Sequence, residues 1–133
     1  MIEFTDVVKC YEQGNKALNG VTMQIDDGEF CFLVGPSGSG KSTIIKLITG
    51  ELRPTSGTVK VNGYALERIR KREIPLLRRT VGVVFQDFRL INNMTLYDNV
   101  AFAMRVIGAR EREIRDRVPY VLELVGLENK ANR

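Results

Sequence analysis

A phosphate-loop pattern constrains this chain more than any other feature of its sequence. Residues 35–42 fit the pattern G-x-x-x-x-G-K-[ST]. In order, they are Gly35, Pro36, Ser37, Gly38, Ser39, Gly40, Lys41 and Ser42. Glycines let successive backbone N–H groups converge on phosphate oxygens, and a helix that begins at the end of the loop adds its positive end. The pattern therefore predicts a nucleoside triphosphate site.

The residues on either side of this loop support the same interpretation. The apolar run of residues 30–34 predicts a fully buried strand. Apolar side chains at helical spacing over residues 44–48 predict a helix, which Gly50 and Pro54 end. A strand, this loop and a helix in that order are typical of a phosphate-binding α/β fold. The alternative, a flexible Gly/Ser turn, explains neither the predicted strand before the loop nor the predicted helix after it.

The end of the pattern predicts which side chains contact the nucleotide. Lys41 supplies a flexible positive charge to the β- and γ-phosphates, the Ser42 hydroxyl is a candidate ligand for Mg²⁺, and Thr43 is placed to contact the α-phosphate. The guanine-reading pattern N/T-K-x-D is absent, because Asn129 and Lys130 are followed by Ala and Asn. We therefore predict ATP and Mg²⁺ as the cofactors.

Charge and composition exclude several classes of function. The chain has 133 residues, a net charge of +4 and no His, which excludes His metal ligands and Ser-His-Asp catalysis. Residues 67–79 hold six basic and two acidic side chains, so the excess charge is one patch, and we expect no nucleic acid as a partner. That patch is either a solvated face or a surface for anionic lipid or an acidic partner. Without an apolar leader or membrane-length apolar run, we expect a soluble intracellular chain.

Apolar periodicity predicts the other elements. Strands are expected at residues 2–4, 21–25, 59–61 and 81–85, the last one buried. Residues 66–79 are expected to be helical and broken by Pro75. Two later helices are expected, one from the N-cap Thr95 to Gly108 and one over residues 110–125 before Gly126. Pro119 predicts a kink or restart in the second of them.

Two further segments resemble motifs of the nucleotide-binding domain of ABC-type ATPases. Tyr11 lies 24 residues before Gly35, and the sequence TVGVVFQDFRL contains Gln86. The resemblance implies that Tyr11 stacks on adenine and that Gln86 contacts Mg²⁺ or the attacking water. It also implies that the loop after Gln86 docks on an integral membrane partner. Reading residues 83–87 as a Walker B strand is the weaker alternative, because Gln86 precedes the acid and Phe88 follows it.

The resemblance covers almost the whole chain and implies its architecture. The expected fold is that of an α/β P-loop NTPase. Residues 1–86 are expected to form an N-terminal antiparallel β-subdomain and the P-loop core through the strand that carries Gln86, and residues 87–133 to form the start of a helical subdomain. The chain contains no SGG tripeptide and no His. The resemblance therefore implies that the signature, the Walker B strand with its catalytic Glu and the switch His lie beyond residue 133. We expect an incomplete core sheet, ATP binding with poor hydrolysis by this chain alone, and a homodimer for the complete domain.

The segments PTSG, REIPLLRRTVGVVFQDFRL and VLELVGLE resemble the branch of this family that acts in bacterial cell division. That branch implies a cytoplasmic protein held peripherally on the inner face of the bacterial plasma membrane. Two alternatives stay open. One is a non-catalytic nucleotide-binding module. The other is a small P-loop kinase with residues 110–117 as an arginine-rich lid, although those residues are also typical of a solvated helix face.

Overall fold

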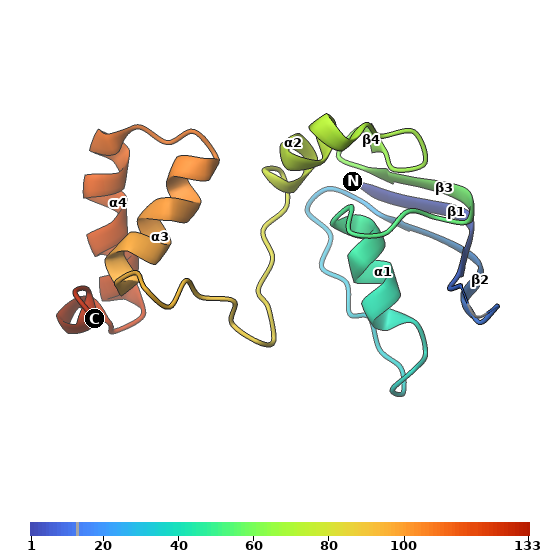
Figure 1. Ribbon diagram of the computed structural model, residues 1–133, viewed down its shortest axis with the longest axis horizontal. Helices are drawn as coiled ribbons and strands as arrows, with labels where there is room; N and C mark the ends of the chain where they lie inside the picture. The colour runs from blue at the N-terminus through green and yellow to red at the C-terminus, as the bar shows by residue number, and fades with distance from the viewer. Residues whose placement is uncertain (13) are drawn as a thin grey trace. The chain divides into compact units, whose positions relative to one another are not determined.

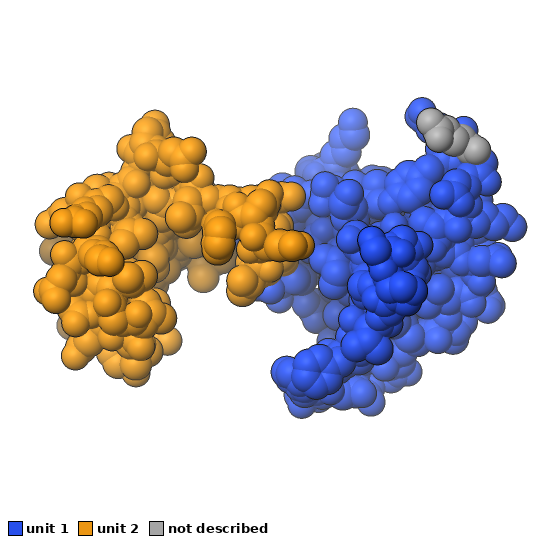
Figure 2. Space-filling view, turned by 90° about the horizontal axis from the view of Figure 1, so that it is seen from below, with its two compact units in different colours: residues 1–82 blue, residues 83–133 orange. Residues whose placement is uncertain are grey.

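The computed structural model describes residues 1–12 and 14–133, in two compact units. The first unit is Met1–Gly82 and the second is Val83–Arg133, coloured separately in Figure 2. No helix in the described residues is long and apolar enough to cross a membrane. The boundary that the resemblance implies, after residue 86, stays a prediction about the subdomains of a complete domain.

The first unit is built on an antiparallel sheet of four strands (Figure 1). The strands are β1 (Ile2–Cys10), β2 (Lys16–Ile25), β3 (Ser56–Val61) and β4 (Tyr64–Ala65), in the spatial order β2-β1-β3-β4. Phe4 on the central strand β1 pairs with Met23 on one side and Val59 on the other. This sheet confirms the predicted antiparallel β-subdomain.

A glycine permits the close approach of β1 and β3. Gly57 has a φ of +79°, and a Cβ there would lie 2.3 Å from the carbonyl oxygen of Asp6. The pairing of β1 with β3 shifts register between Thr5 and Val8, opposite this glycine. A side chain at residue 57 would therefore collide with the backbone of the bulged strand.

The helix α1 (Lys41–Ile48) packs its apolar face on this sheet. Leu47 is fully buried and Ile44 nearly so, in one core with Phe4 and Val59. Full burial of a side chain of this size contributes about 1.5–3 kcal/mol. Because α1 begins directly after the phosphate loop, this packing fixes the end of the loop to the core.

The helix predicted over residues 66–79 is much shorter in the structure. A 3₁₀ turn, Lys71–Glu73, leads into α2 (Ile74–Arg78). Pro75 lies in the first turn of α2, where a residue without an N–H is tolerated, so it begins a helix and does not break one. Leu66, Ile69 and Leu77 are buried and anchor the segment on the core.

The prediction of two buried strands is wrong. Residues 30–34 and 81–85 form no strand, and several of their apolar side chains are exposed: Phe30 by 82%, Val34 by 83% and Val84 by 99%. A buried strand of a parallel sheet needs hydrogen-bonded neighbours and cover on both faces. In the described residues neither segment pairs with another strand. The expectation of an incomplete core sheet is therefore confirmed.

The second unit is a pair of helices with its own core. Helix α3 (Leu96–Val106) and helix α4 (Glu111–Leu124) bury Ala101, Ile114 and Val118 between them. Their caps follow the prediction: the Thr95 hydroxyl accepts a hydrogen bond from the Asp98 N–H at 3.1 Å, and Gly108 and Gly126 have positive φ after the helix ends. A short 3₁₀ turn, Glu128–Lys130, follows.

Two features of α4 bear on its prediction. The helix continues through Pro119, so the predicted restart does not occur, and the alternative of a kink stays a prediction. Val125, which the predicted helix included, lies one residue beyond the end of α4 and is 63% exposed.

Candidate nucleotide-binding site

The phosphate loop reaches its shape through two glycines with left-handed backbones. Gly38 has a φ of +80° and Gly40, the N-cap of α1, a φ of +100°. A Cβ on Gly40 would lie 2.8 Å from the carbonyl oxygen of Ala17 and 2.9 Å from Leu18 Cδ2. The loop therefore rests directly on the backbone of β2, and only glycine fits there.

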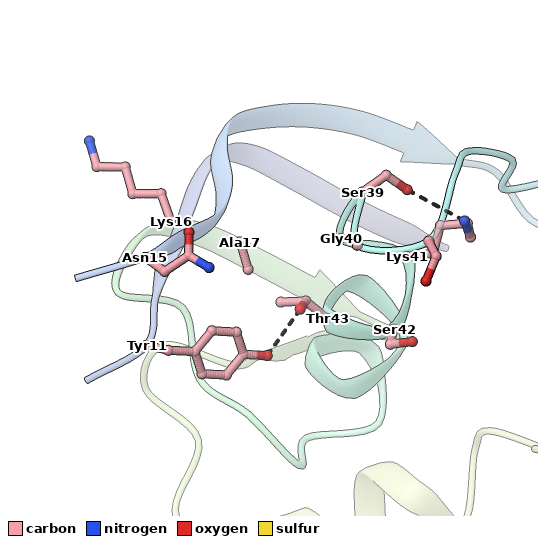
Figure 3. Close-up of a pocket in the computed structure, with 11 residues that line it drawn as sticks. Tyr11, Asn15, Lys16, Ala17, Ser39, Gly40, Lys41, Ser42 and Thr43 are labelled. Atoms are coloured by element: carbon pink, nitrogen blue, oxygen red, sulfur yellow. Dashed lines mark hydrogen bonds between the residues drawn. The ribbon is translucent and has the colours of Figure 1, made fainter. Parts of the chain in front are cut away.

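The Lys41 ammonium lies against the inside of its own loop. Its Nζ donates to the carbonyl oxygens of Gly35 and Pro36, the latter at 2.9 Å, and to Ser39 Oγ at 3.4 Å. The bond to Ser39 is drawn in Figure 3. Backbone carbonyls thus hold the cation among the residues where a phosphate is predicted to bind.

A side-chain hydrogen bond joins Tyr11 to the helix that follows the loop. Tyr11 Oη and Thr43 Oγ1 are 3.0 Å apart, as Figure 3 shows. Thr43 is only 6% exposed, whereas Tyr11, directly after β1, is 40% exposed. The hydroxyl end of Tyr11 is therefore fixed beside α1, and part of the side chain stays open to a ligand.

These residues share one cavity of about 520 Å³, within the typical range of about 300–1,000 Å³ for ligand sites. Tyr11 lies at one end of the set in Figure 3, and Lys41 and Ser39 lie at the other. Its lining comprises Tyr11, Asn15, Lys16, Ala17, Ser37, Gly38, Ser39, Gly40, Lys41, Ser42 and Thr43. It therefore offers an aromatic side chain, a cation and a glycine-rich loop to the same ligand.

Most of the predicted site residues belong to this cavity. Gly35 and Pro36 do not line it but hold Lys41 through their carbonyl groups. Gln86 is exposed, lies in the second unit and is not among the lining residues, so its role stays a prediction. Asn15, Lys16 and Ala17 also line the cavity but were not predicted. No local pattern marks them, because the pairing of β1 with β2 brings them to the loop.

The residues present fit a magnesium ion held mainly by a nucleotide. In the described chain, no group of three His, Cys, Asp or Glu side chains could hold a metal by itself. Ser42 is exposed and lines the cavity beside Lys41. Mg²⁺ commonly keeps several waters and binds through one or two protein oxygens plus substrate phosphates. The Ser42 hydroxyl is an oxygen of this kind, and its role as a ligand of Mg²⁺ stays a prediction.

The sheet, the loop and α1 together define a P-loop nucleotide-binding protein. A model of the family described as ABC transporter matches residues 18–133. The chain belongs to this family.

The curated relatives it matches include cell division ATP-binding proteins FtsE. It is 50% identical to FtsE of Streptococcus pneumoniae over 98% of this chain and 56% of that protein. It is 50% identical to FtsE of Bacillus subtilis over 100% of this chain and 58% of that protein. The chain therefore spans little more than half the length of these relatives.

Solved structures of ATP-binding cassettes share the fold. The dimeric cassette MJ0796, in a post-hydrolysis state with ADP and Pi, matches with a TM-score of 0.88 and 33% identity, over 100% of this chain and 61% of that one. The subunit cbiO1 of Clostridium perfringens, part of the ABC transporter complex cbiONQ, matches with a TM-score of 0.82 and 30% identity, over 99% of this chain and 53% of that one. The resemblance found in the sequence is thus confirmed at the level of the fold.

Proposed function

We propose that this chain is part of the ATP-binding subunit of an ABC system that acts in bacterial cell division, coupling ATP binding and hydrolysis to a membrane partner. The observation that carries the proposal is the cavity that joins Tyr11 to the phosphate loop. Relatives named FtsE at about 50% identity support the biological setting. Because the chain spans 56% and 58% of those two proteins, the activity of a complete subunit is itself part of the proposal.

The cavity supports a specific arrangement of ATP. Adenine stacks on the ring of Tyr11, and the triphosphate follows residues 37–43, where the loop and the start of α1 supply N–H donors. Lys41, held within the loop by carbonyl groups, exchanges those contacts for phosphate oxygens. Ser42 holds Mg²⁺, which when bound neutralises charge on the phosphates.

We further propose that hydrolysis by this chain alone is slow. Phosphoryl transfer to water needs a residue that orients or deprotonates the water, besides the groups that stabilise phosphate charge. Lys41, Ser42 and Gln86 are stabilising or positioning groups, and no general base is assigned among these residues. The chain by itself is then a nucleotide-binding module, which keeps the non-catalytic alternative open for it. Membership of the ABC transporter family disfavours the other alternative, a small P-loop kinase.

The proposed membrane partner, by resemblance an FtsX-like integral membrane protein, docks on the segment after Gln86. Phe88 there is 79% exposed and Leu90 56% exposed, which supplies apolar surface for such a contact. We propose a cytoplasmic location, peripheral on the inner face of the bacterial plasma membrane. We also propose a homodimer for the complete domain, as in the dimeric cassette MJ0796.

Equilibrium binding of a fluorescent ATP analogue in the presence of Mg²⁺ tests the site. The variant Lys41→Ala removes the cation from the loop, whereas Lys46→Ala removes an exposed lysine from the same helix, outside the cavity. A hydrogen bond to a charged group is worth about 1.5–3 kcal/mol. We expect Lys41→Ala to weaken binding by at least about tenfold and Lys46→Ala to leave it unchanged. Equal affinity of the two variants would show that the nucleotide does not use this loop.

Two further measurements test the proposed function: the preference of the site for ATP over GTP, and the rate of ATP hydrolysis. ATP should compete with the analogue better than GTP, because the stacking aromatic is paired with no guanine-reading motif. Steady ATP hydrolysis that Lys41→Ala abolishes, in the purified 133-residue chain, would overturn the proposal of slow turnover. Transfer of phosphate to an added small-molecule acceptor would instead restore the kinase alternative.

A further inference from the structure

The basic segment at residues 66–79 carries charge that the nucleotide site does not use. Its cations are Arg68, Arg70, Lys71, Arg72, Arg78 and Arg79, all exposed. None of them lines the cavity beside the phosphate loop. The segment accounts for the whole net charge of the chain, so an electrostatic field of one sign is concentrated there.

The described residues neutralise little of this charge. Arg68 lies 3.9 Å from the Glu67 carboxylate, at the limit of an ion pair, and Arg78 Nε donates to the Thr49 carbonyl at 3.0 Å. In the part of the chain that the structure describes, Arg70, Lys71 and Arg72 form no ion pair with an acidic side chain. Their guanidinium and ammonium groups are therefore available to an anion from outside.

Buried side chains and hydrogen bonds hold the backbone of residues 66–79 in place. Ile69 is 4% exposed and its carbonyl oxygen accepts a hydrogen bond from Arg53 Nη2 at 2.6 Å. The Arg70 N–H donates to the Glu73 carboxylate at 2.7 Å, and Leu77 is fully buried. These anchors hold the backbone while the neighbouring cations extend into solvent. Because the backbone is already ordered, binding of the segment costs little further conformational entropy, and its cations can contact one surface at the same time.

An exposed apolar side chain lies within the same charged segment. Leu76 is 45% exposed, between the buried Leu77 and the exposed Pro75. Cations combined with an apolar side chain are typical of surfaces that rest on a bilayer, where the charges meet phosphates and the apolar group enters the headgroup boundary. Arginine, the main cation here, matches phosphate oxygens with two parallel N–H donors.

We propose that the segment of residues 66–79 binds the anionic headgroups of a lipid bilayer directly. This inference rests on the proposed location at the inner face of the membrane, which supplies such headgroups. Polybasic segments gain about 1 kcal/mol for each Lys or Arg near an anionic surface, and one patch of this kind gives weak, salt-sensitive attachment. The patch therefore adds a second contact to the one that the membrane partner makes, and orients the ATP-binding unit on the bilayer.

Vesicle flotation with two charge-matched variants tests this surface. The variant R70Q/K71Q/R72Q removes three unpaired cations from the segment. The variant R112Q/R115Q/R117Q removes three exposed cations from α4, so both variants fall from a net charge of +4 to +1. Circular dichroism confirms that each variant is folded, and binding of the fluorescent ATP analogue, which no substituted residue is expected to contact, is measured in parallel.

We expect the wild-type chain to float with vesicles of phosphatidylcholine containing 30% phosphatidylglycerol, and not with phosphatidylcholine alone. At about fivefold per cation, R70Q/K71Q/R72Q should lower partitioning by about 100-fold, whereas the α4 variant lowers it by less than about threefold. Raising the salt to about 1 M, where the screening length is about 3 Å, should release the wild type.

Three outcomes would overturn the proposal. Equal losses in the two variants would assign the attachment to net charge alone. Equal flotation with neutral vesicles would assign it to exposed apolar side chains such as Phe88. Binding to a synthetic acidic peptide, without binding to anionic vesicles, would make the segment a protein-docking surface. Failure of ATP-analogue binding in the wild type would count against the proposed function instead, because the lipid assay contains no nucleotide.

Discussion

Replacing Gly40 by alanine tests how the phosphate loop is supported. In the structure a Cβ at residue 40 would lie 2.8 Å from the carbonyl oxygen of Ala17 and 2.9 Å from Leu18 Cδ2, with the backbone at a φ of +100°. Gly38 is the matched control, because its φ is +80° and a Cβ there meets no atom within 4 Å. Both substitutions put an alanine into a left-handed backbone conformation, which costs free energy of folding. Only Gly40→Ala also makes the new Cβ overlap with atoms of β2.

The two contributions have separate magnitudes. A left-handed backbone costs an alanine about 1–2 kcal/mol, and this cost is shared by both variants. Overlap with packed atoms that cannot move freely adds about 1–3 kcal/mol. Leu18 is only 4% exposed and belongs to the core of the first unit, so it has little room to retreat. We therefore expect Gly40→Ala to be less stable than Gly38→Ala by about 1–3 kcal/mol.

Urea unfolding followed by circular dichroism measures the difference in free energy of unfolding, and hydrogen exchange locates it. Amides of β2 and α1 should lose protection in Gly40→Ala, while those of α3 and α4, in the other unit, should keep it. Equal unfolding midpoints for the two variants would refute the reasoning, because the loop would then not rest on the backbone of β2. A loss of protection in α3 would show instead that the units do not unfold separately.

Substitutions at three other residues have expected outcomes. Tyr11→Ala should weaken binding of the ATP analogue by about 1–3 kcal/mol through lost stacking, whereas Tyr11→Phe, which loses only the hydroxyl contact to Thr43, should change it by less than about tenfold. Thr95→Ala should destabilise the second unit by about 1 kcal/mol in urea, and Thr95→Ser, which keeps the hydroxyl that accepts from Asp98, should not. Hydrogen bonds from the Arg105 guanidinium hold the pKa of the Glu111 carboxyl below its ordinary value. The pair therefore stabilises the fold at pH values above the ordinary pKa, and this stabilisation is lost as the pH falls through the lowered pKa of the folded state. An NMR titration of Glu111 that is unchanged in Arg105→Gln would contradict this origin.

Features that depend on a few neighbouring residues could be predicted from the sequence. The cap at Thr95 and the glycines after α3 and α4 were found from local patterns, because a helix end is satisfied by groups within a turn of it. The start of α1 followed in the same way from the loop pattern. Gly38 and Gly40 take the left-handed conformations for which a phosphate loop needs glycine.

Features that depend on distant partners could not be predicted. Residues 30–34 have the apolar run of a buried strand, but a strand forms only when another one lies beside it, and no pattern within the run supplies that neighbour. The contact between Tyr11 and Thr43 joins residues 32 positions apart. This contact depends on where β1 ends relative to α1. The resemblance predicted that Tyr11 belongs to the site, but no sequence pattern predicted the hydrogen bond of its hydroxyl group.

The phosphate loop keeps its shape although the segment before it is not a strand, and its own contacts explain why. The Ser39 N–H donates to the Pro36 carbonyl at 3.2 Å, and Lys41 Nζ donates to that same carbonyl at 2.9 Å. The Ile44 N–H closes the first turn of α1 on the Gly40 carbonyl at 3.0 Å, and Gly40 rests on β2. None of these contacts involves residues 30–34. The loop is therefore organised by α1 and the antiparallel sheet.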